Sequence, residues 1–490
     1  MLHSPRDQAG IAMVTTILVV FVMSLLAVGM LEVSNRNSTA TAHNRSWGQA
    51  VHVAESGVHE AIAYLQQSGG VVPAGAVSGT TADGSYQYRV VAMSRHRYQI
   101  DATGTVGTTV SLRGSRRLRV LMAPPSSFQY ALFSLSDVTT KNNNLVCGDI
   151  WANTYVVVYQ NDSVMPGSAG ACPAGSSGSG SVTAATGYVE LQTNSTIAGD
   201  AWSGGNNSSS QAVTLANGAH IGGSAKASSS TPGCADDPTH AAYKVANSGS
   251  ISGSVTTWGT ISGGGSSGTQ SPLTCTTASA TKNMPLFSFN PANYAAGTLQ
   301  QYTFPTDYAA FNSYLAANKN NLSGTFYIVG GDATTPITLS GVSVGGDLTI
   351  VATDAPIDAA QGIGSVAGST SDKLVVLASY YTAPPTNCST NGGNPGDCAI
   401  GFKNNFQPSS SDLSGGDNTA VLLYAPNGPI AFKNNAEFQG AVYGNNIQVK
   451  NNMNVIYDPR VEQVIGFGPV TLDVTRWLEC NPGPVTTSSC

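Results

Sequence analysis

The segment Ala431–Asn452, AFKNNAEFQGAVYGNNIQVKNN, repeats after 17 residues, with Phe432-Lys-Asn-Asn and Val449-Lys-Asn-Asn in equivalent places. Apolar residues stand two positions before and two positions after Gly440, as in a short β-strand pair. Asparagine accepts the left-handed backbone angles of tight corners, and stacked asparagine side chains can hydrogen-bond from coil to coil. The segment therefore predicts coils of a parallel β-solenoid, whose small apolar side chains only neighbouring coils can cover.

Related units recur along the chain, and Lys-Asn-Asn also begins at Lys141 and Lys403. The units that share this register are Val146–Ala152, Ile197–Ser203, Ile221–Ala227, Ile251–Thr256 and Phe438–Gly444. Their spacing is irregular, which we interpret as insertions at the corners. We expect the solenoid to occupy residues 126–480 and a tail to occupy 481–490, with a β-sandwich as the alternative fold.

Composition supports a large, mainly β protein. Charged residues make up 10% of the 490 residues, 55 residues are glycine and 41% are hydrophobic, which leaves little material for helices and excludes a disordered polyelectrolyte. The formal net charge of −6 argues against a basic nucleic-acid binder. The charge is uneven, however, at +4 up to Ala123 and −10 beyond it.

The N-terminal region has the pattern of one long helix. The 21 residues Ile11–Leu31 are predominantly apolar and would span about 31 Å as a helix, which matches the hydrocarbon thickness of a bilayer. The helical pattern continues from Glu32 to Gln67 without proline, and apolar residues recur there at steps of three and four. We expect a leader over residues 1–10 and one membrane-spanning and amphipathic helix over 11–67. A plain signal anchor is the alternative.

Residues 84–123 change to a period of two, which predicts three antiparallel strands packed on this helix. The segment is rich in arginine, including Arg116, Arg117 and Arg119. We interpret these arginines as a solvated sheet face, with a DNA- or phosphate-binding patch as the alternative.

The N-terminal region resembles the PilX-type minor pilins. The junction Gln8–Val14, the apolar helix after it and the segment Ala54–Ala61, AESGVHEA, carry this resemblance. It implies that a prepilin peptidase cuts between Gly10 and Ile11, that the new N-terminal residue is methylated, and that residues 84–123 form a pilin-like sheet. Larger PilX-type proteins with a right-handed β-helix as their C-terminal part also resemble this chain, through residues 423–459.

One position departs from the pattern of the major pilins, which carry a glutamate five residues into the mature chain. Here that position is Thr15. The glutamate of the major pilins neutralises the terminal ammonium of a neighbouring subunit, and a subunit at the end of a fibre has no such charge to neutralise. Some tip-located minor pilins and the K-type pseudopilin of type II secretion also lack the glutamate. Thr15 therefore favours a tip position, although a shaft position stays open.

All eight cysteines lie beyond residue 146, and none forms a C-x-x-C motif. Their proximity along the chain suggests sequential pairing, although eight cysteines permit 105 connectivities. Such disulfides would contribute about 3 to 4 kcal/mol each and require an oxidising compartment. The expected pairs are Cys147 with Cys172, Cys234 with Cys275, Cys388 with Cys398, and Cys480 with Cys490.

We found no pattern that predicts catalysis, a metal site or a cofactor. Asp149 and Asp200 occupy equivalent positions of two coils, where corner hydrogen bonding is the expected role and an acidic catalytic strip is the alternative. A metal site on the helix is a further alternative to a solvated face, and its four residues would be His52, Glu55, His59 and Glu60. No phosphate-binding loop or nucleophile elbow is present.

The resulting prediction is a minor pilin at the tip of a type IV pilus, which primes assembly and displays the solenoid for adhesion or surface contact. We expect it in the inner membrane before assembly and on the extracellular pilus afterwards, with other pilins, prepilin peptidase and a host or polysaccharide surface as partners. A DNA-capturing competence pilin and a K-like pseudopilin, whose inserted part is helical in that family, are the rivals. The aromatic candidates for surface contact are Trp151, Trp202, Trp258, Tyr155 and Tyr443, and for most of them packing within the fold is the expected role.

Overall fold

The computed structural model divides the chain into two compact units, one formed by Met1–Pro125 with Pro469–Cys490 and the other by Ser126–Gly468. It describes residues 5–67, 72–94, 97–107, 114–123, 128–173, 176–205, 211–227, 243–245, 249–256, 261–262, 266–267, 270–271, 281–285, 287, 289, 291, 294, 297–359, 362–366, 372–382, 388, 397–402, 419–433, 435, 437–463 and 473–480.

The first unit begins with the helix α1, Pro5–Gln67, which is continuous over 63 residues. Proline is compatible with the first turn of a helix, and no other proline interrupts the segment. Its apolar first half reaches a mean hydropathy of 2.6 with none of that stretch buried, so it is long and apolar enough to cross a membrane. The expected helix over 11–67 is thus present, and it extends into the expected leader.

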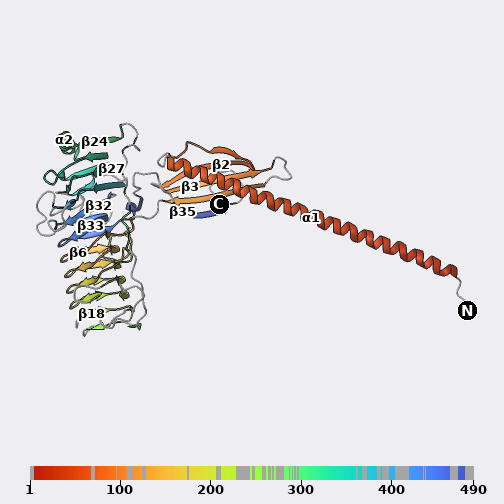
Figure 1. Ribbon diagram of the computed structural model, residues 1–490, viewed down its shortest axis with the longest axis horizontal. Coiled ribbons are helices and arrows are strands. Elements are labelled where there is room, and N and C mark those ends of the chain that lie inside the picture. The colour runs from red at the N-terminus through yellow and green to blue at the C-terminus, as the bar shows by residue number, and fades with distance from the viewer. Residues whose placement is uncertain are drawn as a thin grey trace. The chain divides into compact units, whose positions relative to one another are not determined.

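The second half of α1 packs on an antiparallel sheet with the order β1-β2-β3-β4-β35 (Figure 1). Its strands are β1 Val77–Thr81, β2 Gly84–Ser94, β3 Arg97–Val106, β4 Gly114–Ala123 and β35 Asp473–Cys480. Ala50, Val53 and Val58 of the helix and Ile100 and Val120 of the sheet are buried. The helix approaches β3 so closely that a Cβ on Gly104 would lie 2.2 Å from the carbonyl oxygen of Ala50. The packing of α1 on β3 therefore requires glycine at position 104.

Two strands of this sheet lie outside the residues expected to form it. β1 precedes residue 84, and β35 belongs to the stretch 126–480 that was assigned to the solenoid. Cys480 of β35 pairs with Arg117 of β4, more than 350 residues earlier. Residues 126–468 are therefore an insertion between two neighbouring strands of one sheet. Local periodicity carries no signal for such a pairing, because it depends on which distant segment reaches the open sheet edge.

The second unit consists of short parallel strands stacked coil upon coil. Most strands pair in parallel with the equivalent strands of the neighbouring coils. In chain order, its first half contains β5 Leu132–Ser134, β6 Val138–Thr140, β7 Leu145–Cys147, β8 Ile150–Ala152, β9 Val156–Val158, β10 Ser163–Met165, β11 Val182–Ala184, β12 Val189–Leu191, β13 Thr196–Ile197, β14 Ala201–Ser203, β15 Val213–Leu215, β16 His220–Ile221, β17 Ala225–Ala227, β18 Tyr243–Val245, β19 Ser250–Ile251, β20 Val255–Thr256, β21 Ile261–Ser262, β22 Ser266–Ser267 and β23 Gln270–Ser271. Its second half contains β24 Leu299–Thr303, α2 Tyr308–Asn318, β25 Leu322–Val329, β26 Ile337–Leu339, β27 Val342–Ala352, β28 Ile357–Ala359, β29 Ile363–Ser365, β30 Lys373–Ser379, β31 Ile400–Phe402, β32 Thr419–Phe432, β33 Glu437–Val449, β34 Asn454–Tyr457 and the short 3-10 helix η2 Pro459–Gln463.

The chain enters and leaves this stack at adjacent coils in its middle (Figure 1). β5 pairs with β33, and β34 pairs with β7, so the last coil lies against the first. From β5 the chain proceeds coil by coil to β23 at one end, and it then returns from β24 at the other end. A single stack built from two halves of the chain results.

The inward side chains of all coils form one hydrophobic core that runs from Phe128 to Val461. In β11, β12 and β14 the outer residues of each three-residue strand are buried and the middle one is half-exposed. This arrangement is consistent with a solenoid, and the parallel pairings are not those of a β-sandwich of antiparallel sheets. The chain is thus mainly β with one long N-terminal helix.

Candidate functional surfaces

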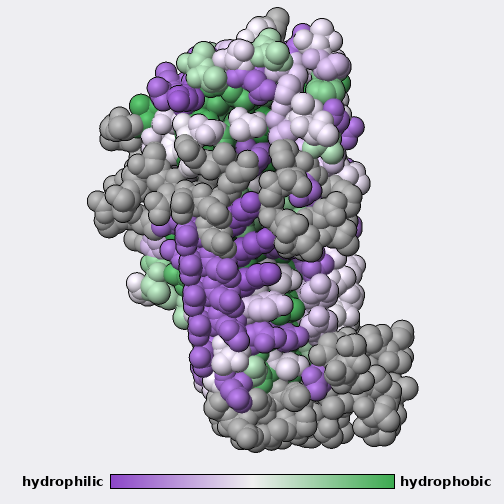
Figure 2. Space-filling view, turned by 90° about the vertical axis from the view of Figure 1, so that its left-hand side faces the viewer, coloured by the Kyte–Doolittle hydropathy of each residue, from purple (hydrophilic) through white to green (hydrophobic). Residues whose placement is uncertain are grey.

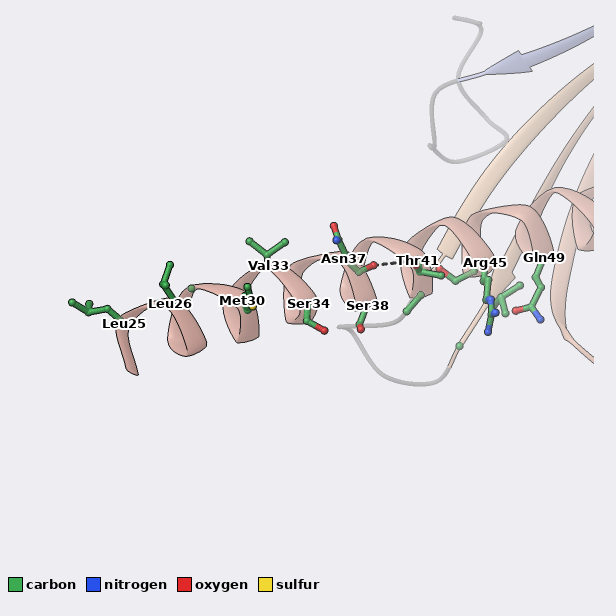
Figure 3. A pocket seen from close by; sticks show the side chains of 15 residues that line it. Leu25, Leu26, Met30, Val33, Ser34, Asn37, Ser38, Thr41, Arg45 and Gln49 are labelled. Carbon is green, nitrogen blue, oxygen red and sulfur yellow. Dashed lines mark hydrogen bonds between the residues drawn. The ribbon is translucent and has the colours of Figure 1, made fainter. Parts of the chain in front are cut away.

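An open groove of about 1220 Å³ follows α1 where the helix leaves the sheet (Figure 3). Leu26, Met30 and Val33 line its apolar part, and Asn37 and Arg45 line its polar part. The groove therefore changes from apolar to polar along the helix, as expected for a helix that leaves a bilayer.

The predicted processing and packing residues all lie on α1. Gly10 and Ile11 are within the helix, Thr15 is exposed, and Glu32 forms an exposed ion pair with Arg36 at 2.5 Å. Glu55 lies farther along and pairs with His52 at 2.9 Å. None of these residues is part of a metal-binding group within the described residues.

The AESGVHEA segment docks the helix on the sheet. A Cβ on Gly57 would lie 3.0 Å from the ring of Tyr86, so glycine makes room for that ring. The Tyr86 hydroxyl donates a hydrogen bond to the carboxylate of Glu60. His59 is exposed. Two residues of the motif thus have structural roles that account for their identity.

Two of the three candidate arginines are not on the surface. Arg117 and Arg119 are 1% and 9% exposed, and both pair with the buried carboxylate of Asp101 at 3.1 and 2.8 Å. Arg116 stacks on the ring of Trp47 at 4.3 Å and contacts Glu479 at 3.2 Å. The prediction of a solvated arginine face is therefore wrong for Arg117 and Arg119, and these residues cannot form a DNA-binding patch while the sheet is intact.

The aspartates of the equivalent corners hydrogen-bond neighbouring coils. Asp149 Oδ1 accepts from the backbone N–H groups of Ser179 and Ser181 at 2.9 Å each. Asp200 Oδ1 accepts from the Ser224 N–H at 2.7 Å. These contacts fit corner hydrogen bonding, and they occupy one carboxylate oxygen of each aspartate.

Most of the aromatic candidates pack against other parts of the chain. Tyr443 and Trp151 stand in one outward column of the stack and are 0% and 6% exposed. A strap, formed by residues 281–285 with Phe287 and Phe289, covers this column through ring and cation contacts. Lys282 of the strap lies over the Trp151 ring at 4.1 Å, and its N–H donates to Asn153 at 3.0 Å. The strap was not foreseen, because its aromatic residues lack strand periodicity.

The other aromatic candidates differ in their surroundings. Trp202 is half-exposed and lies under the ammonium of Lys226 at 4.4 Å. Tyr155 stacks on Tyr188 with the ring centroids 5.0 Å apart. Trp258 lies outside the described residues. Trp202 is thus the tryptophan candidate that keeps a solvent-accessible face in the described part of the chain.

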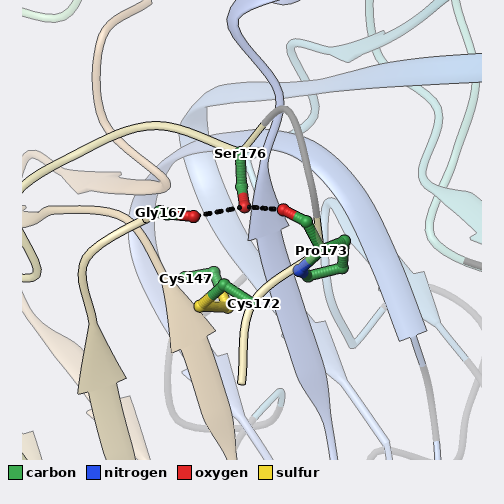
Figure 4. The surroundings of a disulfide bond; sticks show 5 residues. All are labelled: Cys147, Gly167, Cys172, Pro173 and Ser176. Carbon is green, nitrogen blue, oxygen red and sulfur yellow. Dashed lines mark hydrogen bonds between the residues drawn. A yellow bond between two sulfur atoms is a disulfide. The ribbon is translucent and has the colours of Figure 1, made fainter. Parts of the chain in front are cut away.

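Two disulfides tie inserted segments to the stack. Cys147 of β7 is bonded to Cys172 in the segment after β10, and just beyond the closed loop Ser176 Oγ donates to the Gly167 carbonyl at 3.1 Å (Figure 4). Cys388 is bonded to Cys398, and both pack on Ala431. These two expected pairs are confirmed. Cys480 is also disulfide-bonded, while Cys234, Cys275 and Cys490 lie outside the described residues.

Three Lys-Asn-Asn corners and the equivalent corners at Asn161 and Asn194 stack into a continuous polar edge, which we call the asparagine corner. Five asparagines adopt left-handed backbone angles there, and each links to the next through its side-chain amide: Asn194 to Asn161 at 3.4 Å, Asn161 to Asn143 at 3.2 Å, Asn143 to Asn452 at 3.2 Å and Asn452 to Asn435 at 3.1 Å. Figure 2 shows a hydrophilic column running across the stacked coils, the direction in which this corner runs.

Three lysines accompany the asparagine corner. Lys433, Lys450 and Lys141 directly follow the aligned strand ends Phe432, Val449 and Thr140, so they occupy one position of three consecutive coils. Burial, together with the positive charges of Lys141 and Lys433, lowers the pKa of Lys450. Lys403 lies outside the described residues.

Comparison of the chain with protein-family models, with curated proteins and with solved structures returns no match.

Proposed function

We propose that this chain is a minor pilin of a type IV pilus or a related machine, in which α1 first resides in the inner membrane and then packs among other pilin helices. The observation that supports this proposal best is that the two halves of α1 have different surroundings. Its first half is apolar and entirely exposed, whereas its second half packs on the sheet of the first unit. A helix of this kind needs lipid or other apolar helices around its first half, because so much exposed apolar surface is unstable in water.

In this proposal the first unit is the pilin-like module and the insertion Ser126–Gly468 is a right-handed β-helix displayed outside the cell. A domain of that size would obstruct neighbouring subunits in a helical shaft. Thr15, in place of the glutamate of major pilins, agrees with a subunit that has no neighbour beyond it. We therefore place the chain at the pilus tip, where it would prime assembly and present the solenoid for surface contact.

The rival functions receive less support. The described residues of the insertion are mainly strand, whereas a K-like pseudopilin would have a helical insertion. The DNA-capture alternative relied on Arg116, Arg117 and Arg119, of which two are buried against Asp101. We propose no catalytic activity and no cofactor.

Processing of the N-terminus tests the proposal. The mature protein, purified from piliated cells, is expected to begin at N-methylated Ile11 and to co-fractionate with fibres, with antibody label at their ends. Gly10→Val should leave the leader uncut. Gly48→Val is the matched control, because Gly48 is exposed on the same helix and a Cβ there has no neighbour within 4 Å in the described structure. An uncut Met1 in the native protein, or its consistent absence from fibres, would refute the proposal.

A further inference from the structure

We infer that the asparagine corner, together with Lys433, Lys450 and Lys141, binds an extended acidic polysaccharide built of uronic acids, with the polymer lying along the stack across successive coils. This inference names a ligand class for the surface contact proposed above and rests on that function for its biological setting. The binding itself is a property of the second unit and can be measured without pili.

The lysine column carries positive charge that the described protein does not neutralise. Among the described residues, neither Lys433 nor Lys450 nor Lys141 has an ion-pair partner. Like charges on directly opposed residues of neighbouring strands repel each other, so the column is unfavourable by itself. The pKa of Lys450 is lowered by burial and by this repulsion from Lys141 and Lys433. An anionic polymer would relieve it at all three positions.

The asparagines beside the lysines offer hydrogen-bonding groups that match sugar hydroxyls. Four of the ladder asparagines each donate one side-chain N–H to the next coil, Asn435 accepts the last of these bonds, and an amide carries two N–H groups. The five asparagines of the ladder are all exposed residues, so a ligand that lies along the corner can reach their side-chain amides. Tyr159 occupies the position of Lys141 in the next coil. It is half-exposed, so part of its ring is open to contact with a sugar ring.

The repeat of the stack favours a polyuronate over a nucleic acid. Neighbouring parallel strands are about 4.8 Å apart, so the corner presents one lysine per about 4.8 Å. A uronic acid polymer carries one carboxylate per sugar ring, a unit of comparable length. Double-stranded DNA carries one charge per about 1.7 Å, and a chain with a net charge of −6 repels such a density more strongly.

Binding of polymannuronate to the full chain in detergent tests the inference, with a neutral β-1,4-mannan of matched length as the reference polymer and double-stranded DNA as the competing class. We expect the protein to bind polymannuronate and not mannan, and to release it as salt rises. The double substitution Lys141→Gln with Lys450→Gln should weaken binding about tenfold, since it removes two ion pairs that are each weak at a solvated surface. Lys319→Gln is the control for loss of a lysine elsewhere, because Lys319 is exposed like Lys141 but lies at the end of α2.

Three outcomes would overturn the inference: equal binding of the neutral and acidic polymers, equal weakening by the control substitution, or tighter binding of DNA than of polymannuronate. An unchanged thermal unfolding curve of the double variant shows that the corner is still folded. N-terminal processing is measured separately. A correctly processed pilin that does not bind polymannuronate therefore refutes only the proposed binding at the asparagine corner. An uncut protein that binds polymannuronate refutes the pilin function alone.

Discussion

Asp162 is a buried carboxylate in the asparagine corner, and its replacement by asparagine should stabilise the protein at neutral and alkaline pH. The residue is 1% exposed. Its Oδ1 accepts from the Asn144 N–H at 2.7 Å, whereas its buried Oδ2 has no hydrogen-bond partner in the described structure. Burial raises the pKa of Asp162 from 3.8 to about 7, although hydrogen bonds to the carboxylate oppose the rise.

The neighbouring coils show what an asparagine would gain at this position. The Asn144 side chain donates from Nδ2 to the carbonyl of Lys141, three residues earlier, and Ser195 Oγ donates to the Gln192 carbonyl at 2.6 Å in the same way. An ionised Asp162 has no proton to donate to the corresponding carbonyl of Tyr159. A protonated Asp162 or an asparagine can donate one.

The sign of the pH dependence follows from the raised pKa. Between about pH 4 and pH 7 the folded protein binds more protons at this site than the unfolded chain, so the free energy of unfolding falls as pH rises through that window. The full shift corresponds to at most about 4 kcal/mol above pH 7. Asp162→Asn removes this loss, so we expect the variant to gain at least about 1 kcal/mol over the native protein at pH 8 and much less at pH 4.5.

Thermal unfolding of the full chain in detergent at both pH values measures this difference. Asp200→Asn is the control for net charge, since Asp200 is an exposed carboxylate at another corner of the coils. A stability change for Asp162→Asn that is the same at pH 4.5 and pH 8, or a loss of stability at pH 8, would refute the reasoning.

Three further substitutions test the fold by thermal unfolding. Asn143 has a φ of 62° and makes two side-chain hydrogen bonds to neighbouring coils. Asn143→Ala should destabilise the stack by about 1 kcal/mol more than Asn143→Gly, because both variants lose these bonds but only glycine tolerates the backbone angle. Equal effects would contradict this account. Gly104→Val should separate the helix from the sheet and cost about 3 kcal/mol or more, because its Cβ would lie 2.2 Å from the Ala50 carbonyl oxygen. Gly75→Val should have little effect, since a Cβ there has no neighbour within 4 Å in the described structure. Similar losses in both variants would show that the close approach is unimportant. Removing the Cys147–Cys172 bond, whose cysteines are 25 positions apart, should cost about 3.5 kcal/mol, and removing Cys388–Cys398, at a separation of 10 positions, about 2.7 kcal/mol. A larger loss for the shorter loop would contradict the entropic explanation.

Features set by neighbouring residues were accessible from the sequence. The apolar run after Gly10 and the absence of further proline predict the long helix, because helix formation and membrane compatibility depend on residues within a few turns. The recurring Lys-Asn-Asn predicts the stacked corners, because asparagine tolerates the left-handed angle that each corner requires. The pairing of Cys147 with Cys172 and of Cys388 with Cys398 followed from proximity along the chain.

Features set by distant partners were decided by the tertiary structure. The sequence could not show that β35 completes the sheet of the first unit, that β5 lies against β33, or that the strap covers Trp151. Strand pairing and burial depend on which segment hundreds of residues away occupies an open edge or face, and alternation within a strand is the same whichever partner arrives. For that reason Arg117 resembled a surface residue in the sequence, although in the folded protein it is buried beside Asp101.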